Sequence, residues 1–128
     1  MYCLDTSVII DILRGDNNIK FKVAELSNKG EIFLTPITLC ELYKGAYSFH
    51  NQDEKIKDVE KFISFFQILN FDKFSCREFG KFYAKLKKSG VIICDFDLII
   101  ASIVKVNDLI LITRDKHFKN LDIRTEIW

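Results

Sequence analysis

The sequence predicts an α/β fold: a three-layer α/β/α sandwich with a central, mainly parallel sheet. Short apolar runs alternate with longer amphipathic segments along the chain, a pattern typical of a parallel sheet covered by helices on both faces. The chain has 128 residues, is 48% hydrophobic and contains only five Gly and one Pro. We therefore expect one domain over residues 1–128, without linker or repeat. Several acidic residues, moreover, follow apolar runs directly or begin helical patterns.

The first strand and the first helix are predicted at the N-terminus. Tyr2–Leu4 is an apolar run that ends at Asp5. Thr6 or Ser7 can cap a helix that continues to about Leu13, with its apolar residues on one face.

A turn, a second helix and a second strand follow. Arg14–Asn17 contains Gly and Asp and breaks the first helix. Ile19–Lys29 has a helical pattern, and Glu31–Leu34 is an apolar run that predicts a strand. Thr35 and Pro36 then provide an N-cap and a first helical position for the next helix.

The middle of the chain predicts two helices separated by a strand. Asn51–Phe66 is a charged helix with an apolar stripe, and Gln67–Phe71 is a strand. Asp72–Ser89 is the longest helix and ends at Gly90, whereas the apolar run Val91–Cys94 is too short to classify. The predicted buried face of the longest helix consists of Phe79, Phe82, Tyr83 and Leu86.

The C-terminal part predicts a central helix and the last strands. A helix opened by Asp95 or Asp97 continues to about Val106 and is apolar nearly all round, so we expect it in the centre of the fold. Leu109–Thr113 is a β-rich run, and Ile123–Ile127 is a candidate last edge strand.

Four acidic residues stand where strands give way to helices. Because ligand sites in parallel sheets form beyond the carboxyl ends of the strands, these side chains are expected to converge. Clustered carboxylates repel one another unless a cation neutralises them, and oxygen-only ligands suit Mg²⁺ or Mn²⁺. Divalent ions can activate a water molecule and stabilise the leaving oxygen of a phosphodiester. The predicted function is metal-dependent phosphodiester hydrolysis, with metal-binding and catalytic residues Asp5, Glu41, Asp97 and Asp115.

Each acidic residue also has a purely structural explanation. Asp5 can cap the first helix, and Glu41 can form a capping box with Thr38. Asp97 can interact with the positive end of a helix dipole, and Asp115 can form an Asx turn. The joint placement of all four favours the metal site, because independent caps need not converge.

The charge pattern gives only local indications of nucleic-acid binding, since the formal net charge is +1. One basic stripe on the longest helix is either a solvated face or a track for RNA phosphates. It consists of Arg77, Lys81, Lys85 and Lys88. Four other basic residues lie nearer the acidic positions and are better candidates for holding a scissile strand. They are Arg14, Lys44, Arg114 and Lys116.

The four cysteines have no C-x-x-C spacing and no nearby His to complete a zinc set. We interpret them as small core residues of a reduced, cytoplasmic protein rather than as a disulfide framework. The N-terminus lacks the features of a signal peptide, and no apolar run is long enough to span a membrane.

Four sequence motifs together resemble the PIN-domain ribonucleases. They are L-D-T-S-V with Asp5, T-P-I-T-L-C-E-L with Glu41, D-F-D-L-I-I-A-S with Asp97, and L-I-T-R-D with Asp115 followed by His117-Phe118. The chain is most similar to VapC-type toxins of toxin–antitoxin pairs, and the resemblance covers essentially its whole length. It implies a Mg²⁺- or Mn²⁺-dependent endoribonuclease in which these four acids bind the metal.

The resemblance also implies supporting residues and partners. The hydroxyl of Thr6 or Ser7 matches a small polar position beside the first acid, and Ser7 is expected to orient Asp5 or a water molecule on the ion. Thr113 is expected to support the Asp115 turn. The implied partners are an RNA substrate, a small antitoxin protein and a second copy of the chain. Five aromatic residues could either line a groove for a partner or pack in the core, and the sequence favours neither. They are Tyr43, Tyr47, Phe49, Phe65 and Phe66.

Two other functions are compatible with parts of the pattern. A non-catalytic PIN-like RNA-binding or assembly module would share the fold, but it would not need all four acids. A receiver-type phosphoacceptor also clusters acids at strand ends, but it requires an Asp pair after the first strand and a Lys after a later strand. Neither feature is present here, and His117 is interpreted as a surface residue.

Overall fold

Five parallel strands form the centre of the molecule. The computed structural model describes residues 1–128 and arranges the strands in the order β3-β2-β1-β4-β5, with parallel pairing throughout. The predicted parallel sheet is therefore confirmed, and the C-terminal strand lies at an edge as expected. The strands are β1 (Tyr2–Leu4), β2 (Ile32–Leu34), β3 (Gln67–Ile68), β4 (Ile110–Thr113) and β5 (Arg124–Ile127).

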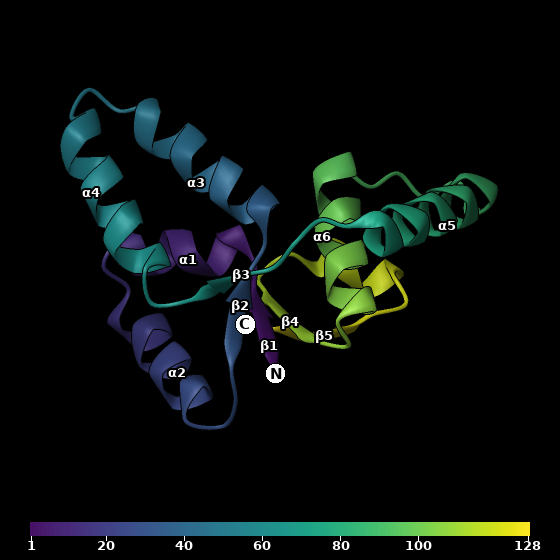
Figure 1. The fold of residues 1–128 in the computed structure, drawn as a ribbon, viewed down its shortest axis with the longest axis horizontal. Helices are drawn as coiled ribbons and strands as arrows, with labels where there is room; N and C mark the ends of the chain where they lie inside the picture. Colours follow the sequence, from purple (N-terminus) through teal and green to yellow (C-terminus); the bar gives the residue numbers. More distant parts are fainter.

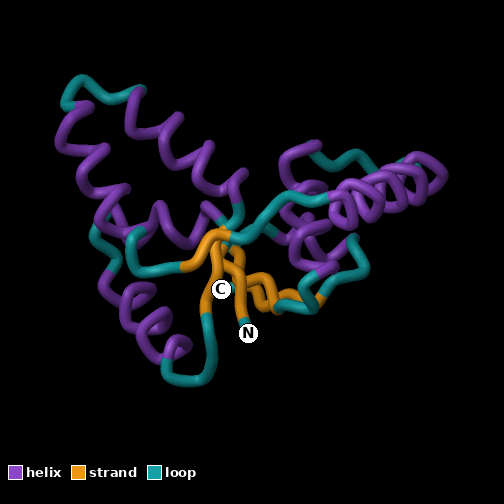
Figure 2. The backbone as a smooth tube through the Cα atoms, viewed as in Figure 1, coloured by secondary structure: helices purple, strands orange, loops and turns teal.

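Helices cover both faces of this sheet, which confirms the three-layer arrangement. Helices α1 to α4 lie on one side and α5 and α6 on the other, with the strands between them (Figures 1 and 2). A short 3₁₀ helix, η1 (Lys116–Asn120), follows β4. The α-helices are α1 (Thr6–Leu13), α2 (Asn17–Ser27), α3 (Pro36–Tyr47), α4 (Gln52–Ile63), α5 (Lys73–Ser89) and α6 (Asp95–Val106).

Two hydrophobic cores fill the spaces between the layers. Successive side chains of a strand point to opposite faces, so Leu4 packs in the core under α1 to α4 while its neighbour Cys3 packs in the core under α5 and α6. The same alternation separates Ile112 from Leu111 in β4. Helix α6 is buried as predicted, with five of its apolar side chains almost fully covered. The sheet is thus fixed from both faces, which holds the carboxyl ends of its strands in place.

Local capping explains where three of the six α-helices begin, including one that starts earlier than predicted. The Asp16 carboxylate accepts a hydrogen bond of 3.1 Å from the backbone N–H of Ile19, so α2 starts at Asn17 rather than at Ile19. Thr35 caps α3 as predicted, and Asp72 caps α5. Gly90 ends α5 in the left-handed conformation, with φ of +73°, which glycine adopts without steric cost.

Several sequence predictions are corrected by tertiary packing. Strand β3 has two residues instead of five, and α4 ends at Ile63 rather than Phe66. Tyr83, predicted on the buried face of α5, is 51% exposed because α5 packs mainly along α6. Of the four cysteines only Cys3 is buried; Cys40, Cys76 and Cys94 are exposed, and all four are free thiols. Of the five aromatic residues left open above, Tyr47, Phe49 and Phe65 are exposed, whereas Tyr43 and Phe66 pack partly against the core.

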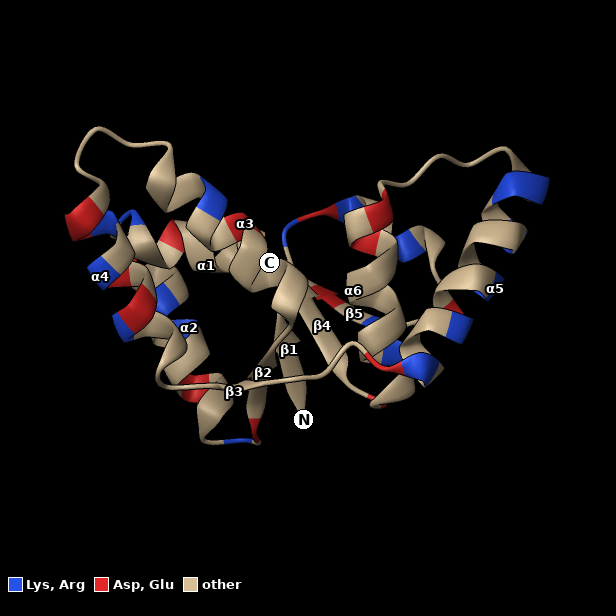
Figure 3. Ribbon diagram, turned by 45° about the horizontal axis from the view of Figure 1, so that its top comes forward, with Lys and Arg blue, Asp and Glu red and all other residues tan.

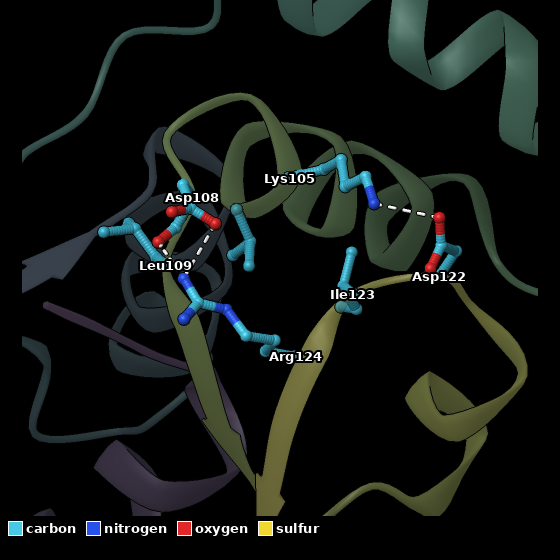
Figure 4. Close-up of a pocket in the computed structure, with 7 residues that line it drawn as sticks. Lys105, Asp108, Leu109, Asp122, Ile123 and Arg124 are labelled. Carbon is cyan, nitrogen blue, oxygen red and sulfur yellow. Dashed lines mark hydrogen bonds and ion pairs between the residues drawn. The ribbon is translucent and has the colours of Figure 1, made fainter.

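Ion pairs attach the edge strand β5 at the amino end of the sheet (Figure 4). The Arg124 guanidinium lies 2.8 Å from the Asp108 carboxylate and also donates to the Asp108 carbonyl. Lys105 lies 2.9 Å from Asp122. A cavity of about 150 Å³ lies between these groups. The four charged side chains that line this cavity pair with one another, so their role is to hold the structure together. None of the helices has the length and hydrophobicity needed to cross a bilayer.

Candidate active site

The adjacent strands β1 and β4 bring two of the predicted acids together. Leu4 pairs with Ile112 in register, and the backbone N–H of Asp5 donates to the carbonyl of Ile112 at 2.9 Å. Asp5 is the first residue beyond β1, and Asp115 is the second beyond β4. Parallel strands with this register end at the same edge of the sheet, so residues 110 positions apart in sequence face one cleft.

Helices α3 and α6 add the other two acids to the same cleft. Glu41 lies in the second turn of α3 and Asp97 in the first turn of α6. These two helices lie on opposite sides of the strands (Figure 3). The cleft has a volume of about 410 Å³ and contains all four predicted acids in its lining. Its lining residues are Asp5, Thr6, Ser7, Ile10, Glu41, Lys44, Gly45, Ser48, Asp97 and Asp115.

Two hydroxyl groups hold the Asp5 carboxylate in one orientation. The hydroxyls of Ser7 and Thr113 each donate to Asp5 Oδ2 at 2.7 Å. The Ser7 oxygen also accepts from the backbone N–H of Arg114 at 3.1 Å, and the Thr113 oxygen accepts from the N–H of Asp115 at 3.0 Å. The network therefore couples the position of Asp5 to the turn that carries Asp115.

The hydroxyl of Thr6 donates to Glu41 Oε2 and links α1 to α3. Neither Thr6 nor Ser7 caps α1: Asp5 occupies the N-cap position, and its side chain makes no capping hydrogen bond. The alternative role for Glu41 is also absent, because Thr35 rather than Glu41 provides the side-chain capping bond of α3. These two carboxylates are therefore free of helix-capping roles.

Asp115 combines a structural contact with a place in the cleft. Its Oδ1 accepts from the backbone N–H of His117 at 2.8 Å, as the Asx-turn explanation predicts, and lies 2.9 Å from His117 Nδ1. The imidazole of His117 is largely exposed, as expected. Asp95, by contrast, is an exposed residue in the first turn of α6 and does not line the cleft.

The cleft carries negative charge that the protein leaves largely unneutralised. No Lys or Arg forms an ion pair with Asp5, Glu41 or Asp97. Burial, and then repulsion from Asp5, Asp115 and Glu41, raises the pKa of the Asp97 carboxyl from 3.8 to about 6. A divalent cation would remove this repulsion.

The donor set fits a hard cation that keeps part of its water shell. All four acids offer carboxylate oxygens, and no His or Cys lines the cleft. No three of the acidic side chains are close enough together to ligate one ion directly. Mg²⁺ is usually bound by one or two carboxylates and several water molecules, whereas Zn²⁺ prefers a closed set of N and S ligands. The arrangement therefore suits hydrated Mg²⁺ or Mn²⁺.

The basic residues proposed from the sequence to hold a nucleic-acid strand lie in different places in the structure. Lys44 lines the cleft, but Arg114 forms an ion pair of 2.6 Å with Asp11. The stripe on α5 is exposed and outside the cleft. Sequence reasoning missed Gly45 and Ser48, which also line the cleft. Helical spacing was the available indication, because residues three, four and seven positions after Glu41 lie on the same face of the helix.

The PIN domain family model matches residues 2–124, nearly the whole chain. This chain belongs to the PIN-domain family. Ribonuclease VapC2 of Haemophilus influenzae is 30% identical over 129 residues, which cover 99% of this chain and 97% of that protein. The resemblance to VapC-type PIN domains drawn from the four motifs is therefore confirmed, and the receiver-type alternative is excluded.

Solved structures agree with this assignment of the PIN domain. The VapBC-1 structure from nontypeable Haemophilus influenzae matches with a TM-score of 0.88 and 30% identity, covering 99% of this chain and 97% of that chain. VapBC-5 of Mycobacterium tuberculosis, a member of the VapBC family of toxin-antitoxin systems, matches with a TM-score of 0.72 and 25% identity, covering 98% and 94%.

Replacing Thr113 by Val in this PIN domain is expected to loosen the cation site. Thr113 is fully buried, and Val keeps its shape but removes the bond to Asp5 and the acceptor for the N–H of Asp115. Loss of such supporting contacts typically weakens metal affinity about 10- to 100-fold, and loss of a hydrogen bond to a charged group costs about 1.5–3 kcal/mol. Calorimetric Mg²⁺ titration and urea unfolding measure both effects.

The control is Thr125→Val, since Thr125 is a half-buried residue of the edge strand β5 and does not line the cleft. Equal Mg²⁺ affinity for the two variants would contradict a role of Thr113 in positioning Asp5.

Proposed function

We propose that this PIN domain is an endoribonuclease that hydrolyses RNA phosphodiester bonds, acting as the toxin component of a toxin–antitoxin pair. The observation that carries the proposal is the convergence of four carboxylates from four separate segments in one cleft, none of which forms an ion pair with a Lys or Arg. The ribonuclease name of a relative that spans almost the entire chain supports the choice of RNA as substrate.

The residues proposed to hold Mg²⁺ or Mn²⁺ are Asp5, Glu41, Asp97 and Asp115, directly or through water. When bound, the ion supplies a lowered pKa for a water nucleophile and charge stabilisation at the leaving oxygen. No Ser-His-Asp or Cys-His set competes for this role, because the cleft contains neither His nor Cys.

The hydrogen-bonding side chains around the acids have positioning roles in this proposal. Ser7 and Thr113 hold Asp5 Oδ2 in place, and Thr6 holds Glu41 Oε2. The carboxyl group of Asp97 is half-protonated at about pH 6 when no cation is bound, because burial and repulsion from the other acids raise its pKa to about 6. The Lys44 ammonium, one helical turn from Glu41, is placed to bind a phosphate oxygen of the substrate strand.

We also infer that this protein pairs with a small antitoxin and forms a homodimer. The structural relatives described as VapBC and as toxin-antitoxin systems support the antitoxin. Growth arrest on expression, relieved by co-expression of the product of a small adjacent reading frame, is the expected result. Arrest that no such product relieves would contradict the toxin role.

Cleavage of single-stranded RNA is the test of the enzymatic function. The purified protein is expected to cleave RNA with Mg²⁺ or Mn²⁺ and to lose this activity with a chelator. Asp5→Asn is expected to be inactive yet folded, since the amide oxygen can still accept from Ser7 and Thr113. Asp53→Asn, on the exposed start of α4, is the control. Full cleavage by Asp5→Asn would contradict the site, and a wild-type protein inactive on every RNA would favour the non-catalytic module.

A further inference from the structure

A second compartment adjoins the carboxylate cleft between α1, α3 and α4. It has a volume of about 150 Å³, and apolar side chains form much of its wall, among them Ile10, Leu13, Leu42 and Phe49. We propose that this compartment is a nucleotide subsite, which binds a base of the RNA strand next to the phosphate that lies in the carboxylate cleft. The proposal rests on the proposed ribonuclease function and extends it.

The two compartments share part of their walls. Ile10, Glu41 and Gly45 line both, so a ligand can extend from one into the other across the surface of α3. A strand with one phosphate near the four acids therefore has an apolar binding surface immediately beside it. This continuity with the acidic cleft favours RNA as the occupant.

Gly45 provides the passage between them. It lies inside α3, where glycine is about 1 kcal/mol less favourable than alanine, and a Cβ at this position would meet no atom within 4 Å. No packing neighbour within the protein therefore requires a glycine here. Glycine does allow a ligand to approach the backbone closely, and a longer side chain here would stand between the two compartments.

The polar groups around the compartment suit a nucleotide. Arg14 and Lys55 line it, Lys44 lines the adjoining cleft, and none of the three forms an ion pair with a carboxylate. Two acids, Glu41 and Asp58, also line the compartment. Because Glu41 is assigned to the metal site, the remaining lining charges are one negative, from Asp58, and two positive, from Arg14 and Lys55.

An exposed aromatic ring offers a stacking surface in the same wall. Phe49 is about half exposed, and Lys55 Nζ lies 5.1 Å from its ring centroid. Bases stack on such rings without sequence preference, and basic residues bind the neighbouring phosphates. The occupant favoured by these groups is a nucleotide of single-stranded RNA.

The test compares Gly45→Leu with Gly80→Leu. Gly80 is also an interior helical glycine with open space around it, but it lies on α5, outside both compartments. Gly45→Leu is expected to lower kcat/KM for a single-stranded RNA oligonucleotide about 10-fold or more, mainly by raising KM. Hydrolysis of bis(p-nitrophenyl) phosphate, which has no neighbouring nucleotide, reports on the carboxylate cleft alone, so Phe49→Ala, whose ring lines only the second compartment, should retain wild-type activity on this substrate. Gly80→Leu should match wild type on both substrates.

Phe49→Ala provides a second variant that removes an exposed ring and leaves the core intact. It is expected to lower kcat/KM for the oligonucleotide about 10-fold, as loss of one base-stacking contact does. Circular dichroism and thermal unfolding verify that each variant is folded.

The outcomes separate this subsite from the proposed function. A wild-type protein that cleaves no RNA would overturn both. An active wild type with unchanged KM in both Gly45→Leu and Phe49→Ala would overturn the subsite alone. Unchanged RNA cleavage combined with lost inhibition by the antitoxin would assign the compartment to the protein partner and likewise overturn the nucleotide subsite.

Discussion

Asp97→Asn is expected to lower RNA cleavage about 1,000-fold while making the metal-free protein more stable at neutral pH. Loss of activity follows because the substitution removes one of four charges proposed to hold the cation; removal of a single charge-stabilising group can cost about 10²–10³ in kcat. The gain in stability follows because burial, and then repulsion from Asp5, Asp115 and Glu41, destabilises the same carboxylate in the folded protein.

The raised pKa of Asp97 makes the stability of the metal-free protein depend on pH. The pKa of Asp97 is about 6 in the folded protein and 3.8 without the fold, so the folded state binds more protons between these values. The contribution of Asp97 to the free energy of unfolding of the metal-free protein therefore falls as pH rises from about 4 to 6 and stays lower above pH 6. For a group fully shielded from solvent, this difference in pKa would lower the free energy of unfolding by about 3 kcal/mol. Because Asp97 is partly exposed, we expect about 1 kcal/mol.

Urea unfolding of the chelated protein at pH 4 and pH 7.5 measures this effect. Asp97→Asn should exceed wild type in stability at pH 7.5 and match it at pH 4. Asp95→Asn is the matched control, since Asp95 lies two residues away in the same helical turn but outside the cleft. A decrease in stability for Asp97→Asn at pH 7.5 would contradict the repulsion among the four acids.

Divalent ions are expected to stabilise the protein strongly and to be required for cleavage. An ion that binds only the folded state at 100 times its Kd stabilises by about 2.7 kcal/mol. For a chain of this length that corresponds to an increase in Tm of about 10 °C. The ion also keeps Asp97 ionised, so the fall in stability between pH 4 and 6 should disappear when Mg²⁺ is present.

Thermal unfolding with Mg²⁺, Mn²⁺ or chelator, at matched ionic strength set with NaCl, separates specific binding from screening. Asp5→Asn should lose most of the Mg²⁺-dependent increase in Tm, whereas Asp53→Asn should keep it. An equal increase in wild type and Asp5→Asn would place the stabilising ion elsewhere on the protein.

Much of the fold could be predicted from the sequence because secondary structure depends largely on local residue patterns. Helix and strand periodicities depend on neighbouring residues, so the alternation of strands and helices and the buried character of α6 were predicted correctly. Thr35 with Pro36 identified the start of α3 for the same reason. Features that depend on distant packing were predicted less well. Tyr83 occupies an apolar position in the helical pattern, but it is exposed because α5 packs mainly against one helix, α6.

The sequence by itself determined the residue types of the proposed site and their places beyond strands or in the first turns of helices, because acid, strand and helix signals are local. Only the tertiary structure decided how these residues interact. The bond from Thr113 to Asp5 spans 108 positions, and the bond from Thr6 to Glu41 spans 35. Such bonds depend on which strands are neighbours, on their register and on how α3 packs against α1. The compartment beside Gly45 arises in the same way, since its walls come from three helices whose packing no single segment specifies.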